Sequence, residues 1–172
     1  MSSSIDLSVV VCVAIPGIAR TLRMALRVMG VRNVVLAADT AQLLEGFTVA
    51  EPSCVIVYVD GENPDDAGLQ TLNFIRRSEA SPHPQIPVVA VSPRCDLLTI
   101  NAVMNGGAHE YVLFPASGEV LLKKINAAWA TTRPWIDKPD YFGPERRMDR
   151  EAQPGKKIPA AAAPEAGETK AI

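Results

Sequence analysis

The residues with the most chemical potential stand where short apolar runs of the sequence end or begin. Asp60 follows one apolar run, Ser92 ends a later run, and Tyr111 opens a third. An aspartate can accept a phosphoryl group, which adds about -1.5 to -2 charge, and a nearby hydroxyl can hydrogen-bond to it. The three residues therefore have the layout of a phosphorylation switch, provided that the fold brings them together.

The apolar runs predict the elements that position these residues. Continuous β-branched runs are typical of strands buried on both faces, and the segments between them carry apolar residues at helical spacing. Pro16 opens the first helix, Gly30 supplies its stop, and Asp39 or Thr40 caps the second. The predicted strands are 7–15, 34–37, 54–59, 88–91 and 111–113, and the predicted helices are 16–29, 39–47, 69–78, 97–105 and 119–130.

This alternation predicts an α/β protein with a five-stranded parallel sheet, doubly wound as (βα)5 and flavodoxin-like. In such a sheet, chemistry collects at the carboxyl ends of the strands. Asp60, Ser92 and Phe114 all fall at predicted strand ends, together with Val13 and Ala14. We therefore expect these five residues to share one edge of the sheet.

Composition excludes several classes of function. The chain has 172 residues, 48% of them hydrophobic, and a formal net charge of -2, which does not favour DNA binding. Its three cysteines lack CxxC spacing and are expected to be reduced thiols, and its two histidines assemble no zinc site. No apolar run is long enough for a membrane span, so we expect a cytoplasmic protein without a membrane partner.

Several spacings carry a resemblance to a known family over about residues 7–130. Asp60 and Pro64 stand four apart, Gly68 and Leu69 follow at the family's distance, and Gly107-Ala108 precedes an aromatic residue. In these features the chain resembles the bacterial two-component response-regulator receiver domain, which is CheY-like in fold. A second alignment, counted forward from Pro52, puts Tyr58 at the acceptor position, but Pro64 and Gly68 then fall two residues too far on.

The resemblance implies a role for each candidate residue. Asp60 matches the phosphoacceptor, Ser92 matches the residue that hydrogen-bonds a phosphoryl oxygen, and Tyr111 matches the aromatic residue that changes rotamer on activation. Phe114-Pro115 matches a Lys-Pro pair whose peptide bond is cis in the family. Alternatively, the three residues have only structural roles: Asp60 caps a turn, Ser92 belongs to a turn, and Tyr111 is a half-buried aromatic residue of a strand.

Three departures from the family pattern predict an impaired switch. Val13 and Ala14 replace two carboxylates that hold Mg²⁺ in the family, and Phe114 replaces the lysine that pairs with the phosphoryl group. Of the family's magnesium ligands only the Asp60 side chain and the Glu62 backbone carbonyl remain. Phosphoryl transfer depends on positioning and on neutralisation by metal and lysine, so we expect weak or absent Mg²⁺ binding, no other cofactor, no enzymatic activity and a pseudo-receiver.

Two alternatives stay open at this site. Glu62, Asp65 or Asp66 can substitute as a metal ligand, since each lies on the loop beside Asp60. Phe114 can simply fill the space of a lysine stem and a metal site, which leaves an apolar pocket with one conformation.

The sequence predicts four regions: a flexible start at 1–6, the receiver-like domain at 7–132, an aromatic and arginine-rich tail at 133–150, and a disordered Pro/Ala-rich segment at 151–172. The stretch Tyr141-Phe142-Gly143-Pro144-Glu145-Arg146-Arg147 resembles the ending of single-domain receivers in bacteria. Its aromatics are expected to pack on or near the domain as a strap while its arginines stay in water.

The function expected from the resemblance is signalling through protein contacts, without an output domain. The expected partners are a histidine kinase, a phosphotransfer protein or a target, approaching the surface around the fourth helix, fifth strand and fifth helix. The alternative is a cyclic di-GMP-responsive adaptor, because Arg146 and Asp149 have the Arg-x-x-Asp spacing of a known cyclic di-GMP motif. In this alternative, Arg146 binds guanine, Asp149 accepts hydrogen bonds from the base, and Trp135 stacks on it.

Overall fold

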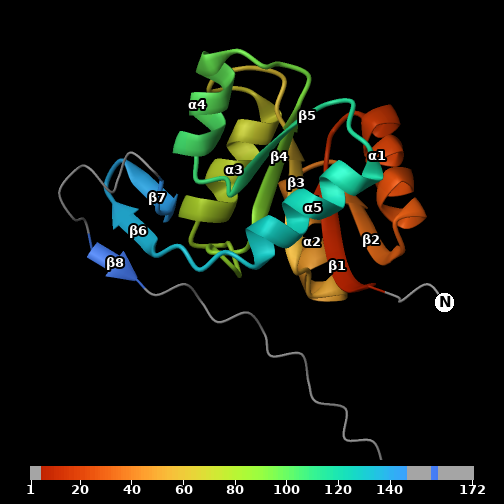
Figure 1. The fold of residues 1–172 in the computed structure, drawn as a ribbon. Coiled ribbons are helices and arrows are strands. Elements are labelled where there is room, and N and C mark those ends of the chain that lie inside the picture. Colours follow the sequence, from red (N-terminus) through yellow and green to blue (C-terminus); the bar gives the residue numbers. More distant parts are fainter. Residues whose placement is uncertain (1–4, 147–155, 159–172) are drawn as a thin grey trace, which may run out of the picture.

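A computed structural model of the chain describes residues 5–146 and 156–158. Its body is a five-stranded parallel sheet with the strand order β2-β1-β3-β4-β5 (Figure 1). The strands are β1 (Ile5–Cys12), β2 (Val31–Ala37), β3 (Cys54–Tyr58), β4 (Val88–Ser92) and β5 (Glu110–Leu113). The predicted fold class is therefore confirmed, and so is the placement of every predicted strand in one sheet.

Five helices cover the two faces of this sheet. They are α1 (Pro16–Val28), α2 (Thr40–Ala50), α3 (Ala67–Arg77), α4 (Leu97–Asn105) and α5 (Gly118–Trp129). Apolar residues of α1 and α5 pack on one face, and those of α2, α3 and α4 pack on the other. The sheet is therefore doubly wound, as right-handed crossovers between parallel strands require.

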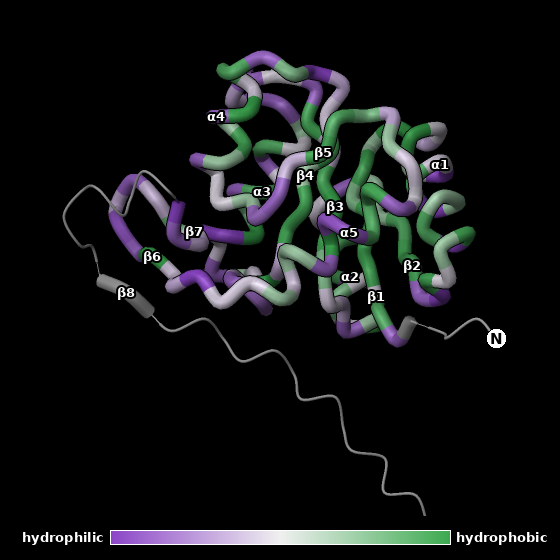
Figure 2. The backbone as a smooth tube through the Cα atoms, viewed as in Figure 1, coloured by the Kyte–Doolittle hydropathy of each residue, from purple (hydrophilic) through white to green (hydrophobic). Residues whose placement is uncertain are grey.

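The core follows from the alternation of side chains along each strand. In β1, Val9 and Val11 face α1 and α5, whereas Val10 faces the opposite layer, and all three have no exposed surface. β3 and β4 are buried in the same way, which is why their sequences read as continuous apolar runs. Figure 2 shows this hydrophobic concentration along the central strands.

Side-chain caps fix where most helices begin. The carboxylate of Asp39 accepts from the Gln42 backbone N–H at 2.9 Å, so α2 begins at the predicted position. Asp96 caps α4 through the Thr99 N–H at 2.9 Å, and α4 has the predicted bounds. The prediction that the first strand continues to residue 15 is wrong, because β1 ends at Cys12 and helix α1 begins at Pro16.

The predicted tail contains regular structure that the sequence analysis missed. β6 (Trp135–Lys138) and β7 (Tyr141–Pro144) form an antiparallel hairpin, and β8 (Lys156–Ile158) pairs with the other edge of β6. These strands are only three or four residues long, too short to show periodicity, and Pro139 stands in the turn. The predicted disordered segment 151–172 contains β8; its other residues, like 1–4, lie outside the described part.

The hairpin is anchored to the body of the protein by two arginines of α3. Arg76 is 3% exposed and its guanidinium lies 5.0 Å from the centre of the Trp135 ring. Arg77 donates to the Lys138 carbonyl at 3.0 Å and lies over the Phe142 ring at 5.6 Å. These cation–π contacts and the hydrogen bond place the aromatic residues of the predicted tail against α3.

The structure also bears on two expectations drawn from composition, the state of the cysteines and the search for a membrane span. Cys12 and Cys54 are buried free thiols and Cys95 is an exposed one, and burial raises the pKa of Cys12 to about 11 and that of Cys54 to about 12. Among the described residues, no helix has the length and apolar character needed to cross a membrane.

Candidate functional site

The candidate site lies at the carboxyl edge of the sheet, where β3, β4 and β5 end side by side. The β3 ladder extends one residue past Tyr58, because the Val59 N–H donates to the Val91 carbonyl at 2.9 Å. Asp60 follows this last ladder residue and is exposed to solvent. The predicted edge is therefore correct for Asp60 and for Ser92, the final residue of β4.

An aromatic pair joins the ends of β3 and β5. The rings of Tyr58 and Phe114 are 6.0 Å apart at 89°, an edge-to-face contact. Both rings pack against the core layer that contains Val13, which is only 4% exposed, whereas Ala14 is exposed. Tyr58, two residues before Asp60, is thus the partner of the residue that replaces the family's lysine. Partial burial, aided by the charge of Asp60, raises the pKa of the Tyr58 hydroxyl.

The loop after β3 is organised by Asp66. One of its carboxylate oxygens accepts from the Asp60 backbone N–H at 2.8 Å, and the other accepts from Gly68 and Leu69 at 2.8 and 3.1 Å. Gly68 is required there, since a Cβ at this position would lie 2.0 Å from the Tyr58 carbonyl oxygen. Asp66 therefore serves as the N-cap of α3, which makes it a poor substitute for a missing metal ligand.

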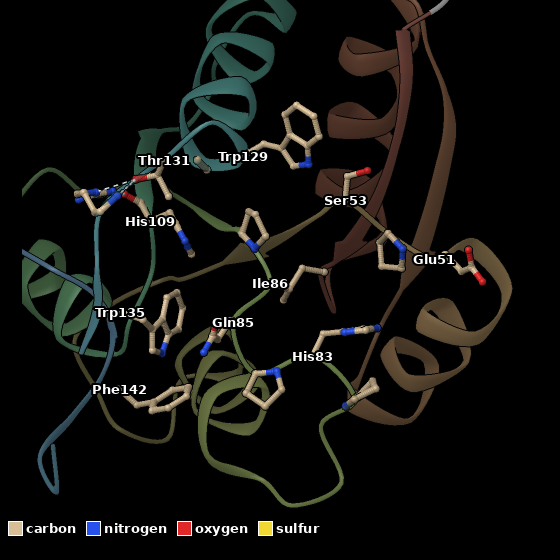
Figure 3. Close-up of a pocket in the computed structure, with 16 residues that line it drawn as sticks. Glu51, Ser53, His83, Gln85, Ile86, His109, Trp129, Thr131, Trp135 and Phe142 are labelled. Atoms are coloured by element: carbon tan, nitrogen blue, oxygen red, sulfur yellow. Dashed lines mark hydrogen bonds between the residues drawn. The ribbon is translucent and has the colours of Figure 1, made fainter. Parts of the chain in front are cut away.

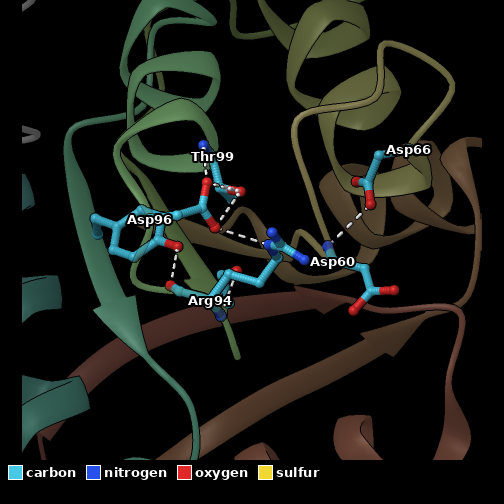
Figure 4. A network of polar contacts seen from close by, with 7 residues as sticks. Asp60, Asp66, Arg94, Asp96 and Thr99 are labelled. Atoms are coloured by element: carbon cyan, nitrogen blue, oxygen red, sulfur yellow. Dashed lines mark hydrogen bonds and ion pairs between the residues drawn. The ribbon is translucent and has the colours of Figure 1, made fainter.

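A cation that the sequence analysis missed stands beside Asp60. Arg94, on the loop between β4 and α4, reaches across toward the Asp60 loop and lies within 4.0 Å of where a Gly61 Cβ would be (Figure 4). Its Nε donates to an Asp96 carboxylate oxygen at 2.7 Å. This hydrogen bond is the main reason that the pKa of Arg94 is raised, and the charges of Glu62 and Asp60 add to it.

The two predicted switch residues both bond to the backbone of Arg94. Ser92 has no exposed surface, and its Oγ accepts from the Arg94 N–H at 3.2 Å. The Tyr111 hydroxyl donates to the Arg94 carbonyl at 2.6 Å. The loop that carries Arg94 is therefore tied to both predicted switch positions. The position of Arg94, two residues after Ser92, was the only sequence signal for this role.

The described side chains around Asp60 form no cluster of the kind that holds a metal ion. Within residues 5–146 and 156–158, no three His, Cys, Asp or Glu side chains cluster closely enough to hold a metal ion. At the carboxyl edge, Val13 contributes a buried methyl surface and Ala14 a methyl group. The Phe114–Pro115 peptide bond is cis, as the resemblance implies.

The residues of the predicted nucleotide site differ in their burial and in their contacts. Trp135 is 2% exposed, with Arg76 over its ring and His109 beside it, so its faces are occupied. Arg146 lies 4.1 Å from the centre of the Tyr141 ring and donates to Asn105. Asp149 lies outside the described residues. Stacking of a free nucleotide on Trp135 would therefore require these contacts to break.

Solved structures with this fold are numerous. The chain is similar to the chemotaxis protein CheY4 of Vibrio cholerae, with a TM-score of 0.59 and 19% identity over 71% of this chain and 98% of that one. It is also similar to a response regulator from Thermotoga maritima, with a TM-score of 0.58 and 19% identity over 74% of this chain and 100% of that one. A CheY-like receiver domain protein from Methanospirillum hungatei JF-1 has a TM-score of 0.56 and 19% identity, with coverage of 72% and 94%.

One sequence relative adds to this likeness. The CAI-1 autoinducer sensor kinase/phosphatase CqsS of Vibrio cholerae is 30% identical over 97 residues, which cover 56% of this chain but only 14% of that protein. No family model matches the chain. What the strand order, the helix layers and these neighbours establish together is that this chain has the CheY-like fold of response-regulator receiver domains.

Proposed function

We propose that this chain is a receiver-type signalling protein of a two-component system that works by protein contacts and takes phosphate poorly. The observation that carries the proposal is the Tyr58–Phe114 pair, two aromatic rings in edge-to-face contact where β3 and β5 end. A phosphoryl group needs cations and hydrogen-bond donors around it; the Phe114 ring supplies neither, and Tyr58 offers one neutral hydroxyl. The pair therefore favours a pseudo-receiver over an efficient phosphorylation switch.

Arg94 does not restore the missing chemistry in this arrangement. Its guanidinium is paired with Asp96 at 2.7 Å, so binding a phosphorylated Asp60 would require it to share or leave that ion pair. The Ser92 Oγ remains as one hydrogen-bond partner for a phosphoryl oxygen. One such bond stabilises by roughly 1.5 to 3 kcal/mol. At the solvent-exposed Asp60 it would act without the paired carboxylates and the lysine that bring metal and positive charge to a phosphoryl group.

The surface proposed for partner binding carries exposed apolar side chains. Leu97 and Leu98 at the start of α4 are 70% and 66% exposed, Leu113 at the end of β5 is 51% exposed, and Val120 of α5 is 44% exposed. Exposed leucines and valines on neighbouring elements are typical of protein interaction sites. We propose that a kinase, a phosphotransfer protein or a target docks on this surface whether or not Asp60 is modified.

A phosphorylation assay tests the proposal directly. Wild-type protein is incubated with Mg²⁺ and acetyl phosphate, and acyl phosphate is quantified by intact mass; Asp60→Asn sets the background. We expect wild type to match that background, whereas the combined variant Val13→Asp, Ala14→Asp, Phe114→Lys, which restores two carboxylates and the lysine, gains a signal. Efficient Asp60-dependent labelling of the wild type would refute the pseudo-receiver.

The cyclic di-GMP adaptor remains the second candidate, but the buried and occupied faces of Trp135 favour it less. Calorimetry with cyclic di-GMP separates the two, on the full chain and on a variant with Arg146→Ala and Asp149→Ala. Binding that only the full wild-type chain shows would support the adaptor.

A further inference from the structure

A pocket of about 790 Å³ lies at the opposite edge of the sheet from Asp60 (Figure 3). Ser53, Pro87 and His109 line it, and each directly precedes a strand of the central sheet, so the pocket is at the amino ends of β3, β4 and β5. Its volume falls in the range of about 300 to 1,000 Å³ that is typical of ligand sites. None of the residues proposed above for phosphorylation or for partner docking lines it.

Aromatic and proline side chains form much of the pocket wall. In Figure 3, Trp135 and Phe142 lie on one side, His83 lies on the opposite side, and Trp129 stands above them. Trp129 is 38% exposed, so its ring is open to a ligand, whereas Trp135 is 2% exposed and adds little accessible surface. Four prolines also line the pocket: Pro52, Pro82, Pro84 and Pro87. Flat, rigid rings of this kind favour a flat apolar group, because packing on them costs little side-chain entropy.

The pocket wall also contains a cation that is fixed in place but only partly bonded. The Arg133 Nε donates to the Thr131 hydroxyl at 3.1 Å, and its Nη2 donates to the His109 carbonyl at 3.2 Å. Of the five guanidinium N–H groups, the other three make no bond to any residue that the structure describes. Two of them are on Nη1 and one is on Nη2, which is the pair of nitrogens that can bind both oxygens of a carboxylate.

A second positive charge lies behind this wall. Arg76 is 3% exposed, lies 5.0 Å from the centre of the Trp135 ring and contacts the His109 ring at 3.3 Å. Its other hydrogen bonds go to three backbone carbonyls, which are neutral. Burial lowers the pKa of Arg76 to about 9, so the guanidinium is still charged at neutral pH. In the described part of the chain, neither Arg76 nor Arg133 forms a salt bridge with a carboxylate.

The balance of charge therefore favours an anion in the pocket. Among the described lining residues, Glu51 is the single carboxylate; it is exposed, and in Figure 3 it lies on the far side of the pocket from Trp135 and Phe142. Two cations thus face one distant acidic group. Since a partly enclosed, ring-lined site screens charge less than open water does, an anionic group beside Arg133 gains more there than on the open surface.

We propose that this pocket binds a small aromatic carboxylate. The flat ring of the ligand packs on Trp129 and the proline rings, and its carboxylate accepts hydrogen bonds from Nη1 and Nη2 of Arg133. The site belongs to the hairpin as well as to the body of the protein, because Trp135 of β6 and Phe142 of β7 line it together with the loops that precede β3 and β4. A bound ligand therefore also holds the hairpin against the sheet.

Two probes of equal shape test the proposal on the full chain, namely 2-naphthoate and its neutral analogue 2-naphthamide. By calorimetry we expect the acid to bind about five- to tenfold more tightly than the amide, since only the acid forms charge-assisted bonds. Added salt should reduce this preference, because it screens the acid and leaves the amide unaffected. Both tryptophans of the chain line the pocket, so their two indole N–H signals in nuclear magnetic resonance spectra should shift on binding and report its place.

Variants with folding checked by circular dichroism separate the charge from the rings. Arg133→Gln should lower the affinity for 2-naphthoate to that for the amide, whereas Arg32→Gln, which removes an exposed arginine of β2, is the matched control and should bind as wild type does. Glu51→Gln should strengthen binding of the acid, and Trp129→Ala should weaken both probes alike.

Three results would overturn the proposal. They are equal affinity of the wild type for the acid and the amide, unchanged binding of the acid by a folded Arg133→Gln variant, and binding that leaves both indole signals in place. If Arg133→Gln does not fold, the comparison of acid with amide in the wild type at low and high salt decides the question without it.

Discussion

At the scale of single residues, the carboxyl edge is governed by side chains that hold a loop rather than a metal. Asp96 caps α4, pairs with Arg94 and accepts from the Thr99 hydroxyl at 3.0 Å. Arg94 in turn is bonded through its backbone to Ser92 and Tyr111. The backbone of Arg94 thus joins both predicted switch positions to the loop whose guanidinium reaches toward the Asp60 loop.

Asp96 gives a pH prediction at this scale. The Thr99 N–H, and then Arg94, lower the pKa of Asp96 from 3.8 to about 2. Because the folded-state pKa is depressed, its contribution to stability is present above about pH 4 and is lost as the pH falls toward 2. We expect the difference in urea midpoint between wild type and Asp96→Asn, which keeps the cap without the charge, to shrink between pH 5 and pH 2.5. A constant difference would contradict the depressed pKa.

At the scale of elements, the hairpin of β6 and β7 needs a close approach to the turn before β5. Gly107 has φ +94°, and a Cβ there would lie 2.4 Å from the Phe142 carbonyl oxygen. Gly143 approaches from the other side, where a Cβ would lie 2.8 Å from the Gly107 Cα. Two glycines face each other so that the two backbones can touch.

Gly107→Ala should therefore separate the hairpin from the body. Left-handed backbone alone disfavours alanine by roughly 1 kcal/mol, and the overlap with Phe142 adds to this, so we expect about 2 kcal/mol or more of destabilisation. Urea unfolding measures it. Gly61→Ala is the control, since its Cβ would meet nothing closer than the Arg94 Cδ at 4.0 Å, and it should be nearly neutral. Equal stability of the two variants would count against the hairpin contact.

At the scale of the whole molecule, His109 is buried by segments distant in sequence. It lies under Trp135 of β6 with a ring separation of 5.6 Å, receives a bond from Arg76 of α3, and its carbonyl accepts from Arg133 at 3.2 Å. Burial, followed by the charges of Arg76 and Arg133, lowers the pKa of His109 well below 6.5. The assembled fold therefore keeps this ring neutral.

The consequence is a loss of stability in mild acid. Since the unfolded chain takes up a proton near pH 6.5 and the folded ring does not, the His109 contribution is present above that pH and is lost as the pH falls. The free energy of unfolding should decline toward pH 5 with a slope of at most about 1.4 kcal/mol per pH unit. In His109→Asn, where an amide oxygen replaces Nδ1 as acceptor, this slope should flatten; an unchanged slope would place the effect elsewhere.

Sequence patterns alone were enough to predict the alternation of strands and helices along the chain, the helix cap at Asp39, and the edge of the sheet at which Asp60 and Ser92 lie. Each of these depends on local patterns: β-branched runs, helical spacing, and side chains that bond to a backbone three residues away. Such patterns act over a few residues, so they can be identified without knowing what packs against them.

Three contacts could be learned only from the folded molecule: Phe114 meets Tyr58, the Arg94 side chain reaches the Asp60 loop at Gly61, and residues 135–144 form a hairpin on α3. These contacts join segments tens of residues apart, and their geometry depends on loop paths that no local pattern encodes. Tyr58 and Asp60 are an example. Strand pairing decides that β3 ends at Tyr58, whereas Asp60 is identified by its position four residues before Pro64 in the following loop.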